Sequence, residues 1–231
     1  MKLHNPLTDA VEGRVIYVLL LVVFVQSIYP ITASNSILSM VIYQTFYASL
    51  MIAGVFVVRD NPIYVKVLVV LGLAWMIAGF VFALNPDATW AILITYAVVG
   101  TFQAMVVYVL LHYVFDATRV NRDVIYAACA AYFLIGGVFV PIYGSIETVT
   151  FAIEGSHAFA DGGVTTDGVV PWQTFIYYSY STLTTLGYGD ILPVTMVARS
   201  AAALEAMIGV LYMAIIIARL VSLYNAEGGE S

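Results

Sequence analysis

Charge is what this sequence has least of. Lys, Arg, Asp and Glu make up only 10% of its 231 residues, whereas 62% of the residues are hydrophobic. Soluble globular domains carry about 25% charged residues, so the composition excludes an ordinary soluble domain and indicates an integral membrane protein. The chain also has a single cysteine, Cys129, which excludes a disulfide within one chain. Because Cys129 lies in an apolar segment, we expect it to pack as a small hydrophobic side chain.

Patterns typical of enzymes are absent as well. The sequence contains no phosphate-binding loop, no residue cluster with metal-ligand spacing and no Ser-His-Asp arrangement. We therefore expect no enzymatic activity, no cofactor and no nucleic-acid partner.

Six long apolar segments make up most of the chain. A helix that spans a bilayer needs about 20 mostly apolar residues. The segments that meet this requirement are residues 14–32, 36–58, 63–84, 89–115, 124–143 and 195–223. They predict an all-α membrane protein with six transmembrane helices in contact with membrane lipid.

The basic residues predict the orientation of these helices, since Lys and Arg gather on the cytoplasmic side of membrane proteins. With the N-terminus inside the cell, only Arg199 among the eight basic residues falls near the outer side. We therefore expect a multi-pass protein of the plasma (cell inner) membrane with both termini in the cytoplasm. Residues 1–13 would form a cytoplasmic lead, 116–123 a cytoplasmic linker and 224–231 a short cytoplasmic tail.

The most informative motif is at residues 184–190, with the sequence Thr-Thr-Leu-Gly-Tyr-Gly-Asp. A strand that turns its backbone carbonyls to one side needs alternating left- and right-handed backbone angles, which cost little only at glycine. Gly187 and Gly189 have the spacing for this alternation. The motif resembles the selectivity filter of potassium channels, in which backbone carbonyl oxygens replace the hydration shell of the ion.

The resemblance implies a potassium-selective channel. It also implies a homotetramer, since one filter strand per chain requires four chains to close a ring. The permeant ion, K⁺, would be coordinated by Thr185, Leu186, Gly187 and Tyr188. The residues expected to support the filter are Thr184, Gly189, Asp190, Tyr177, Tyr178 and Ser181, with Tyr177 or Tyr178 bonded to Asp190. A non-selective cation channel is the alternative, although such relatives usually lose the tyrosine or alter the second glycine.

The same resemblance divides residues 124–223 into the parts of a pore domain. These are an outer helix at 124–143, an extracellular turret at 144–170, a pore helix at 171–183, the filter at 184–190 and an inner helix at 195–223. The turret contains four acids and no Lys or Arg: Glu147, Glu154, Asp161 and Asp167. Two interpretations stay open, a flexible linker that its acids keep in water and a ring of acids that concentrates cations.

Gating residues are predicted on the inner helix. Gly209 is either a hinge or a small residue that allows tight packing. Val210, Met213 and Ile217 share one helical face. The resemblance assigns this face to a water-filled cavity, and the alternative is ordinary helix packing.

Glu205 is the most unusual residue outside the filter motif. An ionisable group inside a membrane helix is costly and indicates a functional role. Its position on the helical wheel directs it away from the proposed cavity face and into protein. We expect it to hydrogen-bond the pore helix, at Ser181 or Thr182, as a structural clamp or as a proton sensor.

The first four segments form a transmembrane domain at residues 14–115 without the arginines of a voltage sensor. Voltage-gated channels carry arginines along their fourth segment, but residues 89–115 contain no Arg or Lys. Arg119 and Arg122 follow this segment, and we expect them to be cytoplasmic anchors. The stimulus that opens the channel would then act through the membrane segments, the turret or an unidentified regulatory partner. A weakly voltage-dependent or pH-gated potassium channel is the remaining alternative.

Overall fold

The computed structural model describes residues 15–27, 48–49, 52, 55, 62–162 and 170–228. The helices over these residues are α2 (Val15–Ser27), α4 (Pro62–Leu84), α5 (Thr89–Asp116), α6 (Arg122–Glu154), α7 (Trp172–Leu183) and α8 (Met196–Gly228). Two short strands, β1 (Phe159–Asp161) and β2 (Ile191–Pro193), form an antiparallel pair in which Ala160 lies opposite Leu192.

Four of the described helices, α4, α5, α6 and α8, are long and apolar enough to cross a membrane. The expectation of an all-α membrane protein is therefore confirmed in its coarse form. Helix α2 covers part of the first predicted segment, 14–32. The second predicted segment, 36–58, lies outside the described residues except at four positions, and the predicted lead at 1–13 lies outside them entirely.

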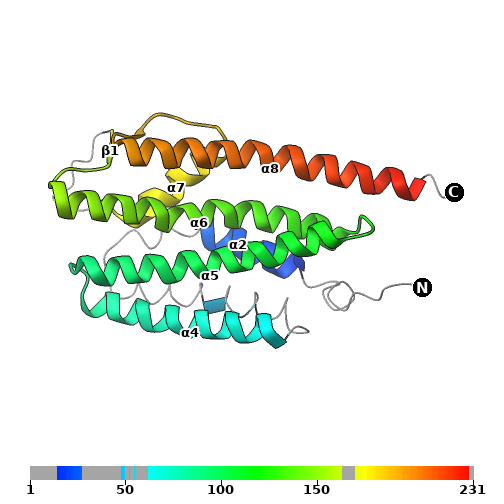
Figure 1. Ribbon diagram of the computed structural model, residues 1–231, viewed down its shortest axis with the longest axis horizontal. Coiled ribbons are helices and arrows are strands. Elements are labelled where there is room, and N and C mark those ends of the chain that lie inside the picture. The colour runs from blue at the N-terminus through cyan, green and yellow to red at the C-terminus, as the bar shows by residue number, and fades with distance from the viewer. Residues whose placement is uncertain are drawn as a thin grey trace.

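The long helices lie side by side, as Figure 1 shows. Helices α4, α5 and α6 alternate in direction, and α8 runs along the other side of α6. The short helix α7 lies between α6 and α8, near the end of the molecule where α6 stops and α8 starts. The pair of strands lies at this same end.

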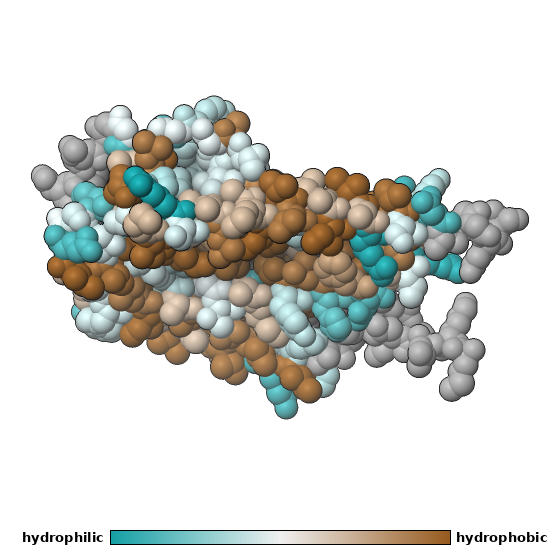
Figure 2. Space-filling model, turned by 45° about the horizontal axis from the view of Figure 1, so that its top comes forward, coloured by the Kyte–Doolittle hydropathy of each residue, from teal (hydrophilic) through white to brown (hydrophobic). Residues whose placement is uncertain are grey.

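Apolar side chains cover much of the outer surface of the long helices. On α4, Ile63, Val70 and Ile77 are spaced by seven residues and are 68%, 64% and 65% exposed, so they share one outward face. Figure 2 shows brown, hydrophobic surface along the flanks of the helices and teal, hydrophilic surface toward the two ends. Such a surface suits the hydrocarbon core of a bilayer, where apolar side chains meet no water.

Helix α6 is longer than the sequence predicted. The outer helix was expected to end at 143, close to Pro141, with the turret starting at 144, but α6 continues to Glu154 with Pro141 inside it. Packing explains the continuation: a Cβ atom at Gly144 would lie 2.5 Å from the ring of Tyr96 in α5, so the two helices approach closely there. The helix ends at Glu154, about three turns past this contact at 3.6 residues per turn, and Gly155 then adopts a left-handed conformation with φ of 66°.

The other boundaries lie close to the predicted ones. Helix α7 begins directly after Pro171, and α8 begins within one residue of the predicted start but runs to Gly228 instead of 223. The tail predicted at 224–231 is therefore helical over its first residues. Arg219 of α8 donates from Nη2 to the backbone oxygens of Phe115 and Ala117, both at 2.9 Å, and so ties α8 to the end of α5.

Candidate functional site

The backbone of the 184–190 motif alternates in handedness. Thr185, Gly187 and Gly189 have φ angles of 58°, 52° and 79°, and they are separated by residues with negative φ. Glycine adopts such angles at little cost, but at Thr185 they carry strain of roughly 1–3 kcal/mol. Alternation of this kind lets successive carbonyls face one side of a strand. Sequence reasoning identified the two glycines but not the strained threonine.

The last turn of α7 holds this strand through its backbone carbonyls. The oxygen of Ser181 accepts the N–H groups of Leu186 and Gly187 at 2.9 and 3.1 Å, and the oxygen of Thr182 accepts the N–H of Thr185 at 3.0 Å. The support expected from Ser181 thus comes from its main chain. Thr184 continues this pattern, since its hydroxyl and its N–H both donate to the oxygen of Tyr180, at 2.6 and 3.1 Å.

Within the described part of the chain, the carbonyl oxygens of the strand have no hydrogen-bond partner. Among the hydrogen bonds between described residues, none ends on the backbone oxygen of Thr185, Leu186, Gly187 or Tyr188. The strand is also exposed along its length in the single chain. Backbone oxygens normally find a partner, so this row of four oxygens is suited to binding a group from outside the chain.

Tyr177 holds the C-terminal end of the strand against α7. Its hydroxyl donates to Oδ2 of Asp190 at 2.7 Å, and its ring stacks on Tyr188 with centroids 6.4 Å apart and planes 3° from parallel. The ring of Tyr188 is thereby turned toward α7. The bond from Tyr177 lowers the pKa of the Asp190 carboxyl below its ordinary value. Tyr178 makes no such bond and is instead buried, with its ring 4.9 Å from that of Tyr143.

The strand pair continues this attachment beyond the motif. The N–H of Gly162, which follows β1, donates to the backbone oxygen of Asp190 at 2.8 Å. Strand β2 starts at the next residue and pairs with β1. The loop after α6 is therefore bonded directly to the end of the 184–190 motif.

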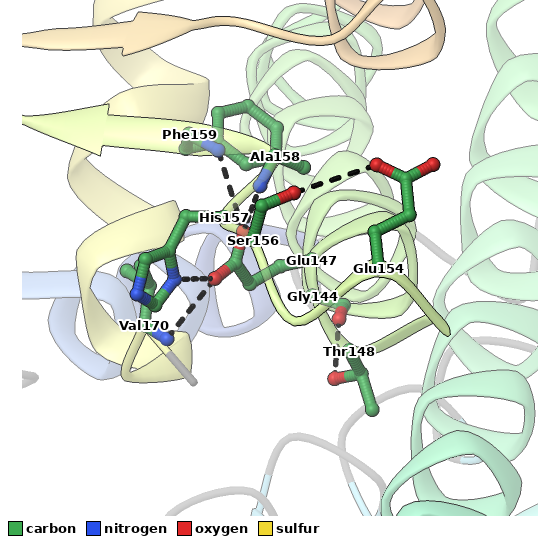
Figure 3. Close-up of polar contacts among 9 residues, drawn as sticks. All are labelled: Gly144, Glu147, Thr148, Glu154, Ser156, His157, Ala158, Phe159 and Val170. Carbon is green, nitrogen blue, oxygen red and sulfur yellow. Dashed lines mark hydrogen bonds and ion pairs between the residues drawn. The ribbon is translucent and has the colours of Figure 1, made fainter. Parts of the chain in front are cut away.

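Glu147 anchors that loop to α6, as Figure 3 shows. Its side chain is fully buried, and its carboxylate accepts the N–H groups of Ala158, Phe159 and Val170 at 2.8, 3.3 and 3.4 Å. Nδ1 of His157 lies 2.6 Å from Oε1 and, facing an acceptor, is the donor. Four donors thus converge on one carboxylate and hold the loop against the helix.

This arrangement corrects the expectation for the turret acids. Glu147 is neither part of a flexible linker nor exposed at the surface, because α6 extends far enough to bury it. Glu154 is exposed and Asp161 is half-buried, while Asp167 lies outside the described residues. The sequence signal that was missed is the apolar, helix-compatible run that carries Glu147, 144–153.

Gly209 lies where α8 meets the end of α7. A Cβ atom there would be 2.1 Å from the backbone oxygen of Leu183, so only glycine allows this approach. Of the two roles expected for Gly209, the contact supports tight packing. Val210, Met213 and Ile217 are 56%, 45% and 55% exposed in the single chain, so within the chain they do not pack in the core.

Glu205 is buried between α6, α7 and α8. Ser179 Oγ lies 2.5 Å from Oε1, and the hydroxyl of Tyr143 donates to Oε2. The expected contact with the short helix exists, but through Ser179 and not through Ser181 or Thr182. Tyr143, from the helix on the other side, was not foreseen.

Arg119 and Arg122 lie outside α5. Arg119 is in the turn between α5 and α6, Arg122 is the first residue of α6, and both are exposed. Neither arginine is part of the membrane-spanning helix α5.

Part of the chain is similar to a known protein family. Residues 127–225, which are less than half of the chain, match a protein family described as ion channel. No curated protein matches the chain. The matched region contains α7, the whole 184–190 motif and most of α6 and α8. Together with the four helices able to span a bilayer, the match indicates a membrane-embedded ion channel.

Proposed function

We propose that this ion channel is selective for K⁺ and conducts it passively through a pore built from four copies of the chain. The observation that carries the proposal is the row of four unpaired, exposed backbone oxygens at Thr185, Leu186, Gly187 and Tyr188. Dehydrated K⁺ needs oxygen ligands in place of water, and a ring of backbone carbonyls supplies them. In this proposal K⁺ is the transported ion and no cofactor takes part.

The tetramer follows from the position of the strand. One chain offers oxygens from one side only, whereas an ion in a pore must be surrounded, so the strands of several copies must converge on an axis. Exposed apolar residues along α8 support such an assembly. Val210, Met213 and Ile217 would line the cavity below the filter.

The positions of the basic residues support a cytoplasmic location for both termini. Arg119, Arg122 and Arg219 belong to the end of the molecule where α5 stops and α8 finishes, and Arg199 belongs to the opposite end with the strand pair. Basic residues favour the cytoplasmic side. The filter would then face outward in the cell membrane, with both termini inside.

Reversal potentials of the purified full-length protein in planar bilayers, in mixed Na⁺ and K⁺ solutions, test the proposal. We expect reversal near the K⁺ equilibrium potential; reversal near zero under opposed Na⁺ and K⁺ gradients would instead establish a non-selective cation channel. A matched pair of variants localises the selectivity. Gly187→Ala and Gly155→Ala both place a Cβ in open space at positive φ, 52° and 66°. Only Gly187→Ala is expected to change selectivity.

A further inference from the structure

Glu205 lies in a polar cluster that contains no cation. In the part of the chain that the structure describes, its carboxyl oxygens contact the hydroxyls of Tyr143 and Ser179, and no Lys, Arg or His pairs with it. The other titratable groups that face it are the hydroxyls of Tyr132 on α6 and Tyr178 on α7. The side chain is 0% exposed. A carboxylate buried this way without a cation would be strongly disfavoured.

The hydrogen bonds around Ser179 indicate whether the Glu205 carboxyl is protonated. Ser179 Oγ lies 2.5 Å from Oε1 of Glu205 and 2.8 Å from the backbone oxygen of Gly136. A serine hydroxyl has one proton to donate, and the Gly136 oxygen has none. Both contacts are hydrogen bonds only if Glu205 supplies the second proton. If Glu205 were ionised, one of these two contacts would place two oxygens side by side with no proton between them.

We propose that Glu205 is a neutral carboxylic acid that positions α7, donating to Ser179 while Ser179 donates to Gly136 and Tyr143 donates to Glu205. This chain of hydrogen bonds joins α8 to α7 and α7 to α6. Its effect on conduction rests on the proposed function of the 184–190 strand. The link to that strand is short, because Ser181, half a turn after Ser179, holds Leu186 and Gly187 through its backbone oxygen.

Loss of the Glu205 proton would break this series of hydrogen bonds between Ser179 and Gly136. Ser179 would turn its proton to the carboxylate and lose its bond to Gly136, and the new charge would have no cation near it. We therefore expect conduction to decline on the alkaline side. The control for this decline is Glu154→Gln, which changes an exposed carboxyl that, among the described residues, accepts a hydrogen bond only from Ser156, at 3.4 Å.

Infrared difference spectroscopy of the purified full-length protein tests the protonation state without any measurement of conduction. The spectrum of the native protein minus that of Glu205→Gln is expected to contain the C=O stretch of a protonated carboxylic acid at neutral pH. Ser179→Ala should shift this band, because the acid loses its acceptor. A difference spectrum with carboxylate bands in its place at neutral pH would overturn the proposal, whether or not the protein proves selective for K⁺.

Flux measurements in liposomes across an alkaline pH series test the positioning role. Glutamine at 205 can donate to Ser179 and accept from Tyr143, so Glu205→Gln should conduct at neutral pH and lose the alkaline decline, whereas Glu205→Ala should lower flux several-fold at every pH. If Glu205→Gln conducts as poorly as Glu205→Ala, or retains the alkaline decline of the native protein, the positioning role is wrong. Glu154→Gln should behave as the native protein throughout.

Discussion

The hydroxyl of Tyr177 donates a hydrogen bond to Oδ2 of Asp190 over 2.7 Å, and this bond ties the last residue of the 184–190 motif to α7. The same tyrosine ring stacks on Tyr188. One side chain of α7 therefore holds the C-terminal end of the strand both through a polar contact and through a ring contact.

Removing the Tyr177 hydroxyl should make the channel more sensitive to acid. The bond lowers the pKa of Asp190, so its contribution is present above the ordinary carboxyl value and is lost as the pH falls through the lowered value. Without the hydroxyl, the pKa of Asp190 rises toward its ordinary value, so the carboxylate is protonated at a higher pH. Potassium flux of Tyr177→Phe, measured over an acid pH series, should show a midpoint above that of the native protein.

A double-variant comparison isolates the Tyr177–Asp190 contact. In an Asp190→Asn background the carboxyl is gone, so adding Tyr177→Phe should leave the acid midpoint unchanged. A shift of equal size in both backgrounds would mean that the Tyr177 hydroxyl acts through some other group.

Gly209→Ala should destabilise the pore region. The new methyl group would lie 2.1 Å from the Leu183 oxygen, and α8 must move away from α7 to accommodate it. Overpacking of this kind costs about 1–3 kcal/mol. The thermal unfolding midpoint in detergent is expected to fall, whereas Ser222→Ala, at an exposed position of the same helix, should leave it unchanged. An unchanged midpoint for Gly209→Ala would contradict the packing role.

Glu147→Gln should loosen the loop after α6. A neutral amide offers one acceptor oxygen to donors that now share two charged ones, and its NH₂ group would face further N–H groups. Hydrogen bonds to charged groups contribute about 1.5–3 kcal/mol each. Hydrogen exchange measured by mass spectrometry should therefore quicken about tenfold or more at Ala158 and Phe159.

Glu154→Gln is the matched control for this experiment, since Glu154 lies on the same helix and is exposed. Its exchange rates over residues 155–162 should equal those of the native protein. Equal protection in Glu147→Gln and in the native protein would show that the carboxylate does not hold the loop.

Neutralising Arg119 and Arg122 together should leave the voltage dependence of the current unchanged. Both side chains are exposed beyond the end of α5, so they do not cross the membrane field with that helix. Voltage-step recordings of Arg119→Gln/Arg122→Gln in planar bilayers measure this directly. A flattened current–voltage relation in the variant would assign a sensing role to these arginines.

Several features of the protein could be predicted from local sequence. The apolar runs at 63–84 and 89–115 became α4 and α5 almost residue for residue, because helix formation in a membrane depends on the length of an apolar stretch. The left-handed backbone at Gly187 and Gly189 was predicted from their spacing, since it depends on the absence of a Cβ atom.

The sequence by itself indicated the apolar segments that form α4 and α5 and the left-handed backbone at Gly187 and Gly189, because both follow from neighbouring residues. Only the tertiary structure decided which atoms face the buried carboxyl groups of Glu147 and Glu205. A helical wheel gives the direction in which the Glu205 side chain points from α8. The packing of α6 and α7 against α8 determines that this side chain contacts Ser179 and Tyr143. Likewise, Glu147 became buried because Gly144 lets α6 pack closely on α5, a contact between residues 48 positions apart (144 − 96).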